Sequence, residues 1–174
     1  MSNVQASLQS LEKALQLEID GMAFYRKASK AAQKTVTKEM FAWLADAEVT
    51  HMDRIKQIGE SLKMTGNWRH IEYGKDHAGI KDVFSRLAIE NKDNLTPAAT
   101  DTQAIDTGLD LEVKSIDFYT GQLGGSGDAN EKAFYTSLIE EETSHYRTLK
   151  DMKFYLEDPG AWFTEHEHHG LDGA

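Results

Sequence analysis

Residues 44–58 read LADAEVTHMDRIKQI, and this stretch decides the fold. Its apolar residues Leu44 and Ile55 belong to a series spaced alternately by three and four positions, which places side chains on one face of an α-helix. Glu48 and His51 occupy the same series at positions where an apolar residue is expected. The stretch therefore predicts an amphipathic helix that carries a carboxylate and an imidazole on its apolar face.

The same pattern occurs a second time in residues 138–152, LIEEETSHYRTLKDM. Glu142 and His145 follow Glu48 and His51 at an offset of 94 positions, and the surrounding residues match at this offset without a gap. A constant offset indicates an internal duplication of one structural unit. Because each copy also contains a second apolar series upstream, we interpret the unit as a helical hairpin.

Four long helices follow from the apolar spacing, at about residues 4–33, 37–65, 101–123 and 129–158. We expect Gly66 to end the second helix, the pair Thr100 and Gln103 to cap the third, and Asp128 to cap the fourth. Residues 65–99 are too many for a simple turn, and the spacing predicts one short helix within them.

The predicted fold class is therefore all-α. Two antiparallel helical hairpins, joined by one long crossover with a short helix, form a four-helix bundle over residues 1–160. Residues 161–174 are expected to be a C-terminal tail. His166, His168 and His169 alternate there with glutamates, which is also typical of a second metal site, but we interpret them as part of a solvated tail.

Every predicted long helix has a glutamate at mid-length on its apolar face, namely Glu18, Glu48, Glu112 and Glu142. In a bundle these faces meet, so the four carboxylates should converge with His51 and His145. Buried ionised carboxylates cost several kcal/mol each, and the apolar series contain no lysine or arginine to neutralise them. Two divalent cations balance four negative charges, so the pattern predicts a site for two metal ions.

The spacing of each motif supports this prediction. In Glu-x-x-His the two side chains project from adjacent turns toward one ion. A single buried copy is more often incidental, whereas two copies in register, each with a glutamate 30 positions upstream, favour metal binding. Glu18 and Glu112 have no histidine on their own helices, and we expect them to bridge the ions. Oxygen and imidazole donors suit iron or manganese and also accept zinc or cobalt.

Other polar or small residues share these faces. Tyr25 and Tyr119 follow the first glutamate of each hairpin by seven residues, and they could donate hydrogen bonds to metal ligands or be ordinary core tyrosines. Gly21 and Ser115 follow the same glutamates by three residues. They could leave space for a bound oxidant, and close packing of helices explains small residues equally well.

The doubled pattern resembles the ferritin-like carboxylate-bridged di-iron proteins. It is most similar to the rubrerythrin group, whose helices carry Phe-Tyr after the first glutamate, as Phe24-Tyr25 and Phe118-Tyr119 do here. The resemblance implies a ferritin-like bundle in which the six residues ligate two irons. It also implies a non-haem di-iron oxidoreductase that reduces hydrogen peroxide or dioxygen, frequently as a homodimer. From their spacing after Glu18 and Glu112, Tyr25 and Tyr119 are our candidate catalytic residues.

Two features depart from that group. Rubrerythrins usually carry a rubredoxin domain with four cysteines, and this sequence contains none. They often have a further glutamate where this chain has Ser115. We therefore expect electrons to come from a separate redox protein.

Charge and composition exclude several classes of function. A net charge of −10 repels phosphate backbones and anionic membrane surfaces, so neither nucleic acid nor membrane is an expected partner. The absence of cysteine excludes thiol nucleophiles and cysteine-bound metal clusters. No apolar run is long enough to span a bilayer, and we expect a cytoplasmic protein.

Three other functions remain open from the sequence. The first is a ferroxidase centre in an iron-storage or iron-buffering shell, which needs a large hollow assembly. The second is oxygenation of an organic substrate, which needs a deep apolar channel. The third is a helical interaction module, which requires the six polar residues to be buried without metal.

Overall fold

A computed structural model gives the fold and describes residues 3–70, 79–91 and 99–169. No strand occurs among these residues, and the all-α prediction is confirmed. The helices in chain order are α1 (Asn3–Ala31), α2 (Thr35–Thr65), α3 (Gly79–Glu90), α4 (Ala99–Gly125), α5 (Ala129–Glu157) and α6 (Pro159–His169).

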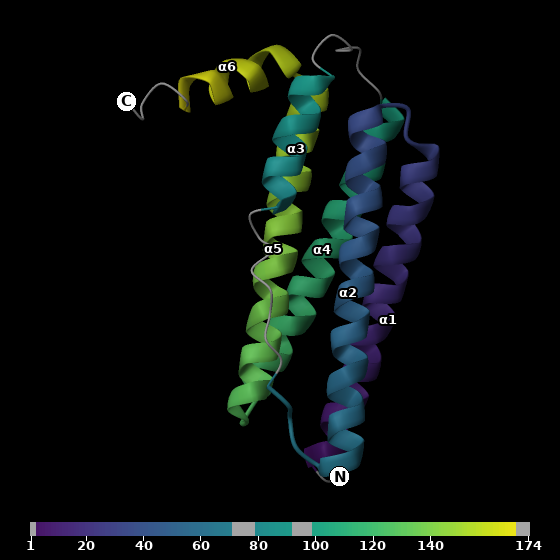
Figure 1. The fold of residues 1–174 in the computed structure, drawn as a ribbon, viewed down its shortest axis with the longest axis vertical. Helices are drawn as coiled ribbons and strands as arrows, with labels where there is room; N and C mark the ends of the chain where they lie inside the picture. The colour runs from purple at the N-terminus through teal and green to yellow at the C-terminus, as the bar shows by residue number, and fades with distance from the viewer. Residues whose placement is uncertain (1–2, 71–78, 92–98, 170–174) are drawn as a thin grey trace.

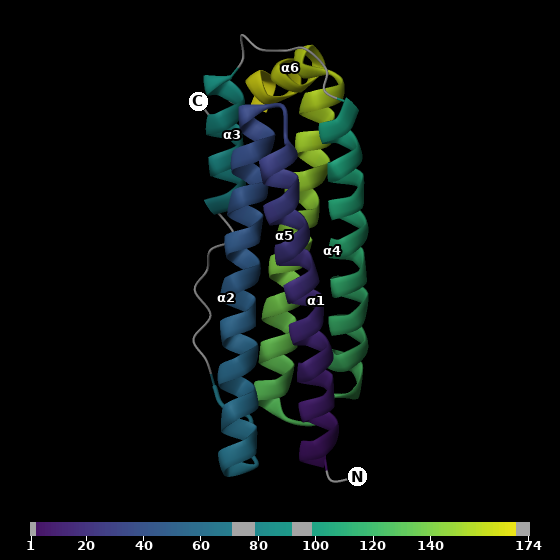
Figure 2. The same cartoon turned by 90° about the vertical axis from the view of Figure 1, so that its right-hand side faces the viewer.

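The long helices form two antiparallel hairpins, α1 with α2 and α4 with α5 (Figures 1 and 2). The hairpins face each other, with α1 against α4 and α2 against α5. The chain leaves α2 at one end of the bundle and enters α4 at the other, which confirms the predicted crossover (Figure 1). Within the crossover, α3 packs against α2 and α5, while residues 71–78 and 92–98 lie outside the described residues.

Two helix ends follow the expected local chemistry. Gly66 follows α2 with a φ of 71°, a left-handed conformation that glycine adopts without a steric penalty. Asp128 caps α5, because its carboxylate accepts hydrogen bonds from the backbone N–H groups of Asn130 (2.7 Å) and Glu131 (3.1 Å). Both predicted ends are confirmed.

The start of α4 differs from the expectation. The helix begins at Ala99, so Thr100 lies in its first turn and is not the capping residue. Asp101 is instead the key residue of this turn: it is buried, and its carboxylate accepts hydrogen bonds from the N–H groups of Gln33 (2.9 Å) and Lys34 (3.0 Å). The first turn of α4 thereby holds the connection between α1 and α2.

The core consists of two apolar clusters at different heights along the bundle. One contains Tyr25, Phe41 and Leu149, and the other contains Tyr119 and Leu138. The predicted apolar faces of α2 and α5 are buried along their whole lengths. The glutamates at mid-helix lie between the two clusters, which leaves one polar layer within an otherwise apolar interior.

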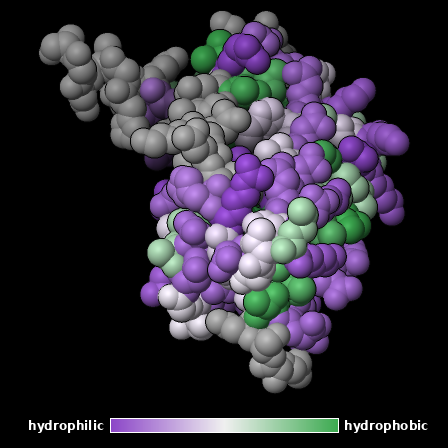
Figure 3. All heavy atoms as spheres, turned by 60° about the horizontal axis from the view of Figure 1, so that its bottom comes forward, coloured by the Kyte–Doolittle hydropathy of each residue, from purple (hydrophilic) through white to green (hydrophobic). Residues whose placement is uncertain are grey.

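The outer surface is mostly polar. Figure 3 shows a largely hydrophilic face on which apolar side chains form small separate groups. Among the described residues, the exposed large hydrophobic side chains are Met64, Ile89 and Val113. No described helix combines the length and the apolar character needed to cross a membrane.

The expected solvated tail is replaced by α6 over residues 159–169, which lies across one end of the bundle (Figures 1 and 2). Trp162 of this helix is buried, and its ring packs edge-on against Phe84 of α3 (5.6 Å) and Tyr155 of α5 (5.4 Å). The prediction was wrong here because burying one tryptophan, about 3 kcal/mol on the usual area scale, is enough to dock a short helix.

The histidines of this segment are only partly described. His166 stacks on Trp162 at a ring distance of 3.9 Å, and its Nδ1 lies 2.9 Å from the Trp162 carbonyl oxygen. Its Nε2 also lies 3.7 Å from a carboxylate oxygen of Asp151, so the ring contacts both α6 and α5. The side chains of His168 and His169 lie outside the described residues, so the expectation that the three histidines do not form a second metal site stays a prediction.

Candidate metal centre

The six residues singled out in the sequence come together at mid-length of the bundle. α1 and α4 each supply one glutamate, and α2 and α5 each supply a Glu-x-x-His motif. None exposes more than 4% of its surface, although all six are polar. The residues are Glu18, Glu48, His51, Glu112, Glu142 and His145.

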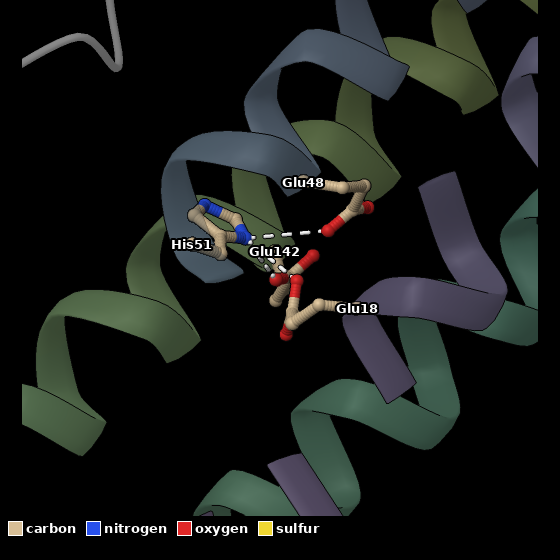
Figure 4. Close-up of side chains that lie close together, drawn as sticks. All are labelled: Glu18, Glu48, His51 and Glu142. Carbon is tan, nitrogen blue, oxygen red and sulfur yellow. Dashed lines mark hydrogen bonds and ion pairs between the residues drawn. The ribbon is translucent and has the colours of Figure 1, made fainter. Parts of the chain in front are cut away.

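The donor atoms fall into two overlapping groups. In the first group Glu18, Glu48, His51 and Glu142 each offer one donor atom, and these atoms lie within 4.8 Å of one another. Figure 4 shows these side chains pointing toward one another from α1, α2 and α5. In the second group Glu112 and His145 meet the same two glutamates, Glu48 and Glu142.

This arrangement differs from the expected roles of the glutamates. Glu48 and Glu142 belong to both groups and would be shared by two ions, whereas Glu18 and Glu112 each belong to one group. The reason is tertiary: α2 and α5 pack side by side, so each of their glutamates reaches across to the other motif. The oxygens of Glu142 lie 3.0 Å from Nδ1 of His51 and 3.3 Å from Nδ1 of His145.

Both histidines turn Nδ1 toward the carboxylates. His51 Nδ1 lies 3.0 Å from Glu18 Oε2 and 3.3 Å from Glu48 Oε2. His145 Nδ1 lies 3.3 Å from Glu142 Oε2 and 3.8 Å from Glu112 Oε2. The two rings are nearly parallel, with centroids 5.6 Å apart. Nδ1 is therefore the nitrogen that each ring offers to an ion.

Two tyrosines bind Glu18 and Glu112, the glutamates that belong to only one donor group, and each tyrosine reaches across to the other hairpin. The hydroxyl of Tyr25 on α1 donates to Glu112 on α4, and the hydroxyl of Tyr119 on α4 donates to Glu18 on α1. Both tyrosines are fully buried. The expected hydrogen bonds to candidate ligands on a neighbouring helix are confirmed, and the catalytic role of the tyrosines stays a prediction.

The protein side chains alone are electrostatically unfavourable at this layer. Burial, followed by the charge of Glu142, raises the pKa of Glu112 to about 8. Burial, followed by the charges of Glu18 and Glu142, also raises the pKa of Glu48. Burial would lower the pKa of His145, but the nearby carboxylates of Glu112 and Glu142 raise it to about 9. These buried groups therefore stay protonated at pH values at which the same groups would lose their protons in solvent.

The unpaired atoms of the layer fit a pair of cations. Both carboxylate oxygens of Glu142 and Nδ1 of His145 are buried without a hydrogen-bond partner among the described residues. Oxygen Oε1 of Glu142 lies near His51, but without the geometry of a hydrogen bond. Buried polar atoms of this kind require a partner. Carboxylate oxygens mixed with imidazole nitrogens suit iron, manganese or zinc, so the donor set matches the predicted dinuclear site.

Sequence reasoning missed a residue behind His51. Glu141 accepts hydrogen bonds from Arg54 (2.5 Å) and Ser137 (3.0 Å), and its other oxygen lies 2.9 Å from Nε2 of His51. Burial would raise the pKa of Glu141, but His51 and Arg54 lower it to about 2. The only local signal was the run of three glutamates that ends at Glu142.

A cavity of about 160 Å³ lies between α1 and α4 and reaches the carboxylates. Its lining includes Gly21, Ser115, Glu48 and Glu112. A Cβ atom at Gly21 would lie 3.3 Å from Oε1 of Glu48, so glycine keeps this approach open. Gly21 and Ser115 thus lie beside open space next to the candidate ligands. This is what the first of the two explanations, space for a bound oxidant, requires.

Comparison with known proteins agrees with this geometry. The family model of rubrerythrin matches residues 9–153, a range that contains all six candidate ligands and both tyrosines. Searches of curated proteins and of solved structures gave no match. The match covers most of the chain, and the fold and the buried carboxylate–histidine layer of the structure agree with this family. The chain belongs to the rubrerythrin family.

Proposed function

We propose that this protein is a non-haem di-iron oxidoreductase that reduces hydrogen peroxide, and dioxygen more slowly. The observation that supports this best is the cavity between α1 and α4, which leads to Glu48 and Glu112 beside the candidate metal layer. A cavity of about 160 Å³ admits only small molecules, and a peroxide molecule fits it.

Each residue of the layer has a distinct part in holding the ions. Glu18 and His51 would hold one ion, Glu112 and His145 the other, and the shared pair of glutamates both. Iron is the proposed occupant, although the same donors accept manganese or zinc. A ferrous pair held by these residues would supply two electrons, which with two protons are what the conversion of one hydrogen peroxide into two water molecules requires.

The surrounding residues prepare this chemistry. The hydroxyls of Tyr25 and Tyr119 fix the orientation of Glu112 and Glu18, which limits the geometries that the outer ligands can adopt. The apolar clusters on both sides of the layer keep bulk water away from it. The face where Gly21 and Ser115 leave room offers a route to the carboxylates.

Re-reduction requires electrons from outside these residues. The 174 residues contain no cysteine that could hold a rubredoxin-type iron. The proposal therefore includes a separate redox protein as electron donor. It also includes a homodimer as the assembly, a cytoplasmic location and a role under oxidative stress. No nucleic acid or membrane partner is proposed, in keeping with the net charge of −10.

Stopped-flow mixing of the Fe(II)-loaded protein with hydrogen peroxide under anaerobic conditions tests the reaction. We expect the absorption of the oxidised iron pair to appear much faster with peroxide than with dioxygen. The peroxidase assignment fails if peroxide leaves the ferrous protein unchanged. A large hollow assembly in size-exclusion chromatography would favour iron storage instead.

A matched pair of variants on α4 tests the access route. Ser115→Leu places a bulky side chain at the cavity lining, and we expect it to slow peroxide-driven oxidation at unchanged iron content. Gly121→Ala is the control, because a Cβ atom at Gly121 meets no other atom within 4 Å. Equal rates in both variants would contradict entry from this side.

A further inference from the structure

The two histidines of the metal layer have different surroundings on the side that faces away from the carboxylates. Behind His51, the carboxylate of Glu141 lies 2.9 Å from Nε2. Arg54 and Ser137 hold Glu141 in place with hydrogen bonds of 2.5 Å and 3.0 Å. His51 therefore has a fixed ring orientation and an anionic acceptor for its second nitrogen.

The duplicated half of the molecule lacks this support. At the offset of 94 positions that relates the two hairpins, each residue of the network is matched by one of different chemistry. The matched pairs are Glu141 with Ala47, Ser137 with Trp43, and Arg54 with Thr148. The acceptor, its hydroxyl donor and its cation are all missing from the second half.

A cavity borders Ala47, the position that matches Glu141 in the other half. This cavity of about 180 Å³ is also lined by Ser144, by both histidines and by Glu141 and Arg54. Because Nδ1 of His145 faces the carboxylates, its Nε2 edge is turned the other way, and the described residues provide no hydrogen-bond partner for it. Trp43 packs edge-on against the His145 ring at 5.7 Å. An apolar contact thus replaces a charged hydrogen bond.

We propose that the two metal positions are unequal: the position of Glu18 and His51 holds its ion tightly, and the position of Glu112 and His145 is the weaker, exchangeable one. The inference rests on the metal centre of the proposed function. A carboxylate behind a ligating histidine orients the ring and makes it a better donor, and losing such a partner typically costs about 10–100-fold in metal affinity. Glu141 is therefore a positioning residue for one position alone.

Anaerobic titration of the full-length, chelator-treated protein with Co²⁺, followed by visible absorption and calorimetry, tests this inequality. We expect two steps of one ion each, separated by about 10–100-fold in dissociation constant. Shared glutamates alone can weaken the second step of any dinuclear site, so the decisive readout is which step each variant changes.

Two reciprocal variants make that comparison. Glu141→Ala should weaken the tight step by about 10–100-fold and bring the two steps together, whereas Glu141→Gln, which keeps an oxygen acceptor, should have a smaller effect. Ala47→Glu should strengthen the weak step, since the cavity beside Ala47 offers room for a carboxylate. Ala47→Gln controls for the change in size, and circular dichroism of the metal-free variants checks the fold.

Histidine variants identify the positions. His51→Ala should leave only the weak step, and His145→Ala only the tight one. Equal loss of both steps in Glu141→Ala, or a tight step that survives in His51→Ala and disappears in His145→Ala, would overturn the inference. A wild-type protein that binds no cobalt would instead overturn the metal centre itself, so the two failures are distinguishable.

Discussion

The polar layer and the two apolar clusters beside it share the same four long helices, and α3 and α6 add residues to one cluster. In the clusters, side chains such as Leu138 and Ile58 bury their apolar surface, which stabilises the fold directly. In the layer, Glu48 and Glu142 occupy the equivalent positions and bury charge instead. One helix face therefore contributes stability at its ends and reduces it in the middle.

This difference separates what folds the protein from what makes it useful. The clusters need no partner outside the chain, whereas the layer contains buried atoms that no described residue satisfies. Functional sites commonly retain such unfavourable groups, because the surrounding structure holds them in place. The bundle can therefore present six preoriented donor groups that a less stable scaffold would bury incorrectly or expose to water.

Metal loading should change the stability of the protein most, because cations neutralise the buried charges of the polar layer. At free ion concentrations about 1,000-fold above the dissociation constant, binding stabilises the fold by about 4 kcal/mol. This corresponds to a rise of about 8–16 °C in the melting temperature of a domain of this size. Calorimetry of iron-loaded and chelated protein measures it, and equal melting temperatures would show that the layer holds no ion.

Single substitutions in the two regions should act with opposite signs in the chelated protein. Leu138→Ala removes buried apolar surface and should cost about 2–5 kcal/mol of unfolding free energy. Glu48→Gln removes a carboxylate whose pKa is raised by burial and by Glu18 and Glu142, so at pH 8 it should increase stability. Urea unfolding at pH 8 tests both changes.

The same two variants provide their own control. Glu48→Gln should lose most of the stabilisation by iron, whereas Leu138→Ala should keep it. A loss of stability in chelated Glu48→Gln comparable to that of Leu138→Ala would mean that the layer is already satisfied by the chain itself.

The pH dependence of the chelated protein reports on the layer in a third way. Glu112 and His145 have pKa values raised from 4.5 to about 8 and from 6.5 to about 9, so between about pH 5 and 9 the folded state holds more protons than the unfolded state. Stability should therefore fall as the pH rises through this range, by at most about 1.4 kcal/mol per pH unit for each extra proton. Urea unfolding from pH 5.5 to 8.5 measures the slope.

Glu112→Gln should flatten part of this slope, because the amide does not titrate. The apolar clusters contribute no comparable titration. A flat or rising profile in the wild-type protein would contradict the proton retention inferred for the layer.

The last comparison uses two tyrosines that stack in one apolar cluster. Tyr119 donates its hydroxyl to Glu18, so Tyr119→Phe should cost about 1.5–3 kcal/mol. The hydroxyl of Tyr135 is buried without a partner among the described residues, so Tyr135→Phe should be neutral or stabilising. Thermal unfolding compares the two, and equal losses would show that the hydroxyl of Tyr119 contributes nothing specific.

Features carried by local pattern could be predicted from the sequence. The apolar series located all four long helices and α3. Asp128 was recognisable as the residue that caps the start of α5. The constant offset between Glu48-x-x-His51 and its copy was enough to place six polar residues in one layer. These predictions succeeded because helical periodicity fixes which side chains share a face.

Features that depend on partners far away in the chain could not be predicted. Asp101 contacts the turn between α1 and α2, and Glu141 lies behind His51, yet neither belongs to an apolar series or a recognisable motif. Trp162 docks α6 on residues of α3 and α5. Each interaction joins helices whose relative placement is not encoded in local spacing.

The amino-acid sequence by itself determined the helical layout, the duplication and the identity of the six buried polar groups, because charge that breaks an apolar face is visible in one dimension. Only the tertiary structure decided that Glu48 and Glu142 are the shared glutamates and that His51 has an anionic partner for its second nitrogen, which no described residue provides for His145. Those properties are distances between atoms on different helices, and they follow from how α2 and α5 pack together.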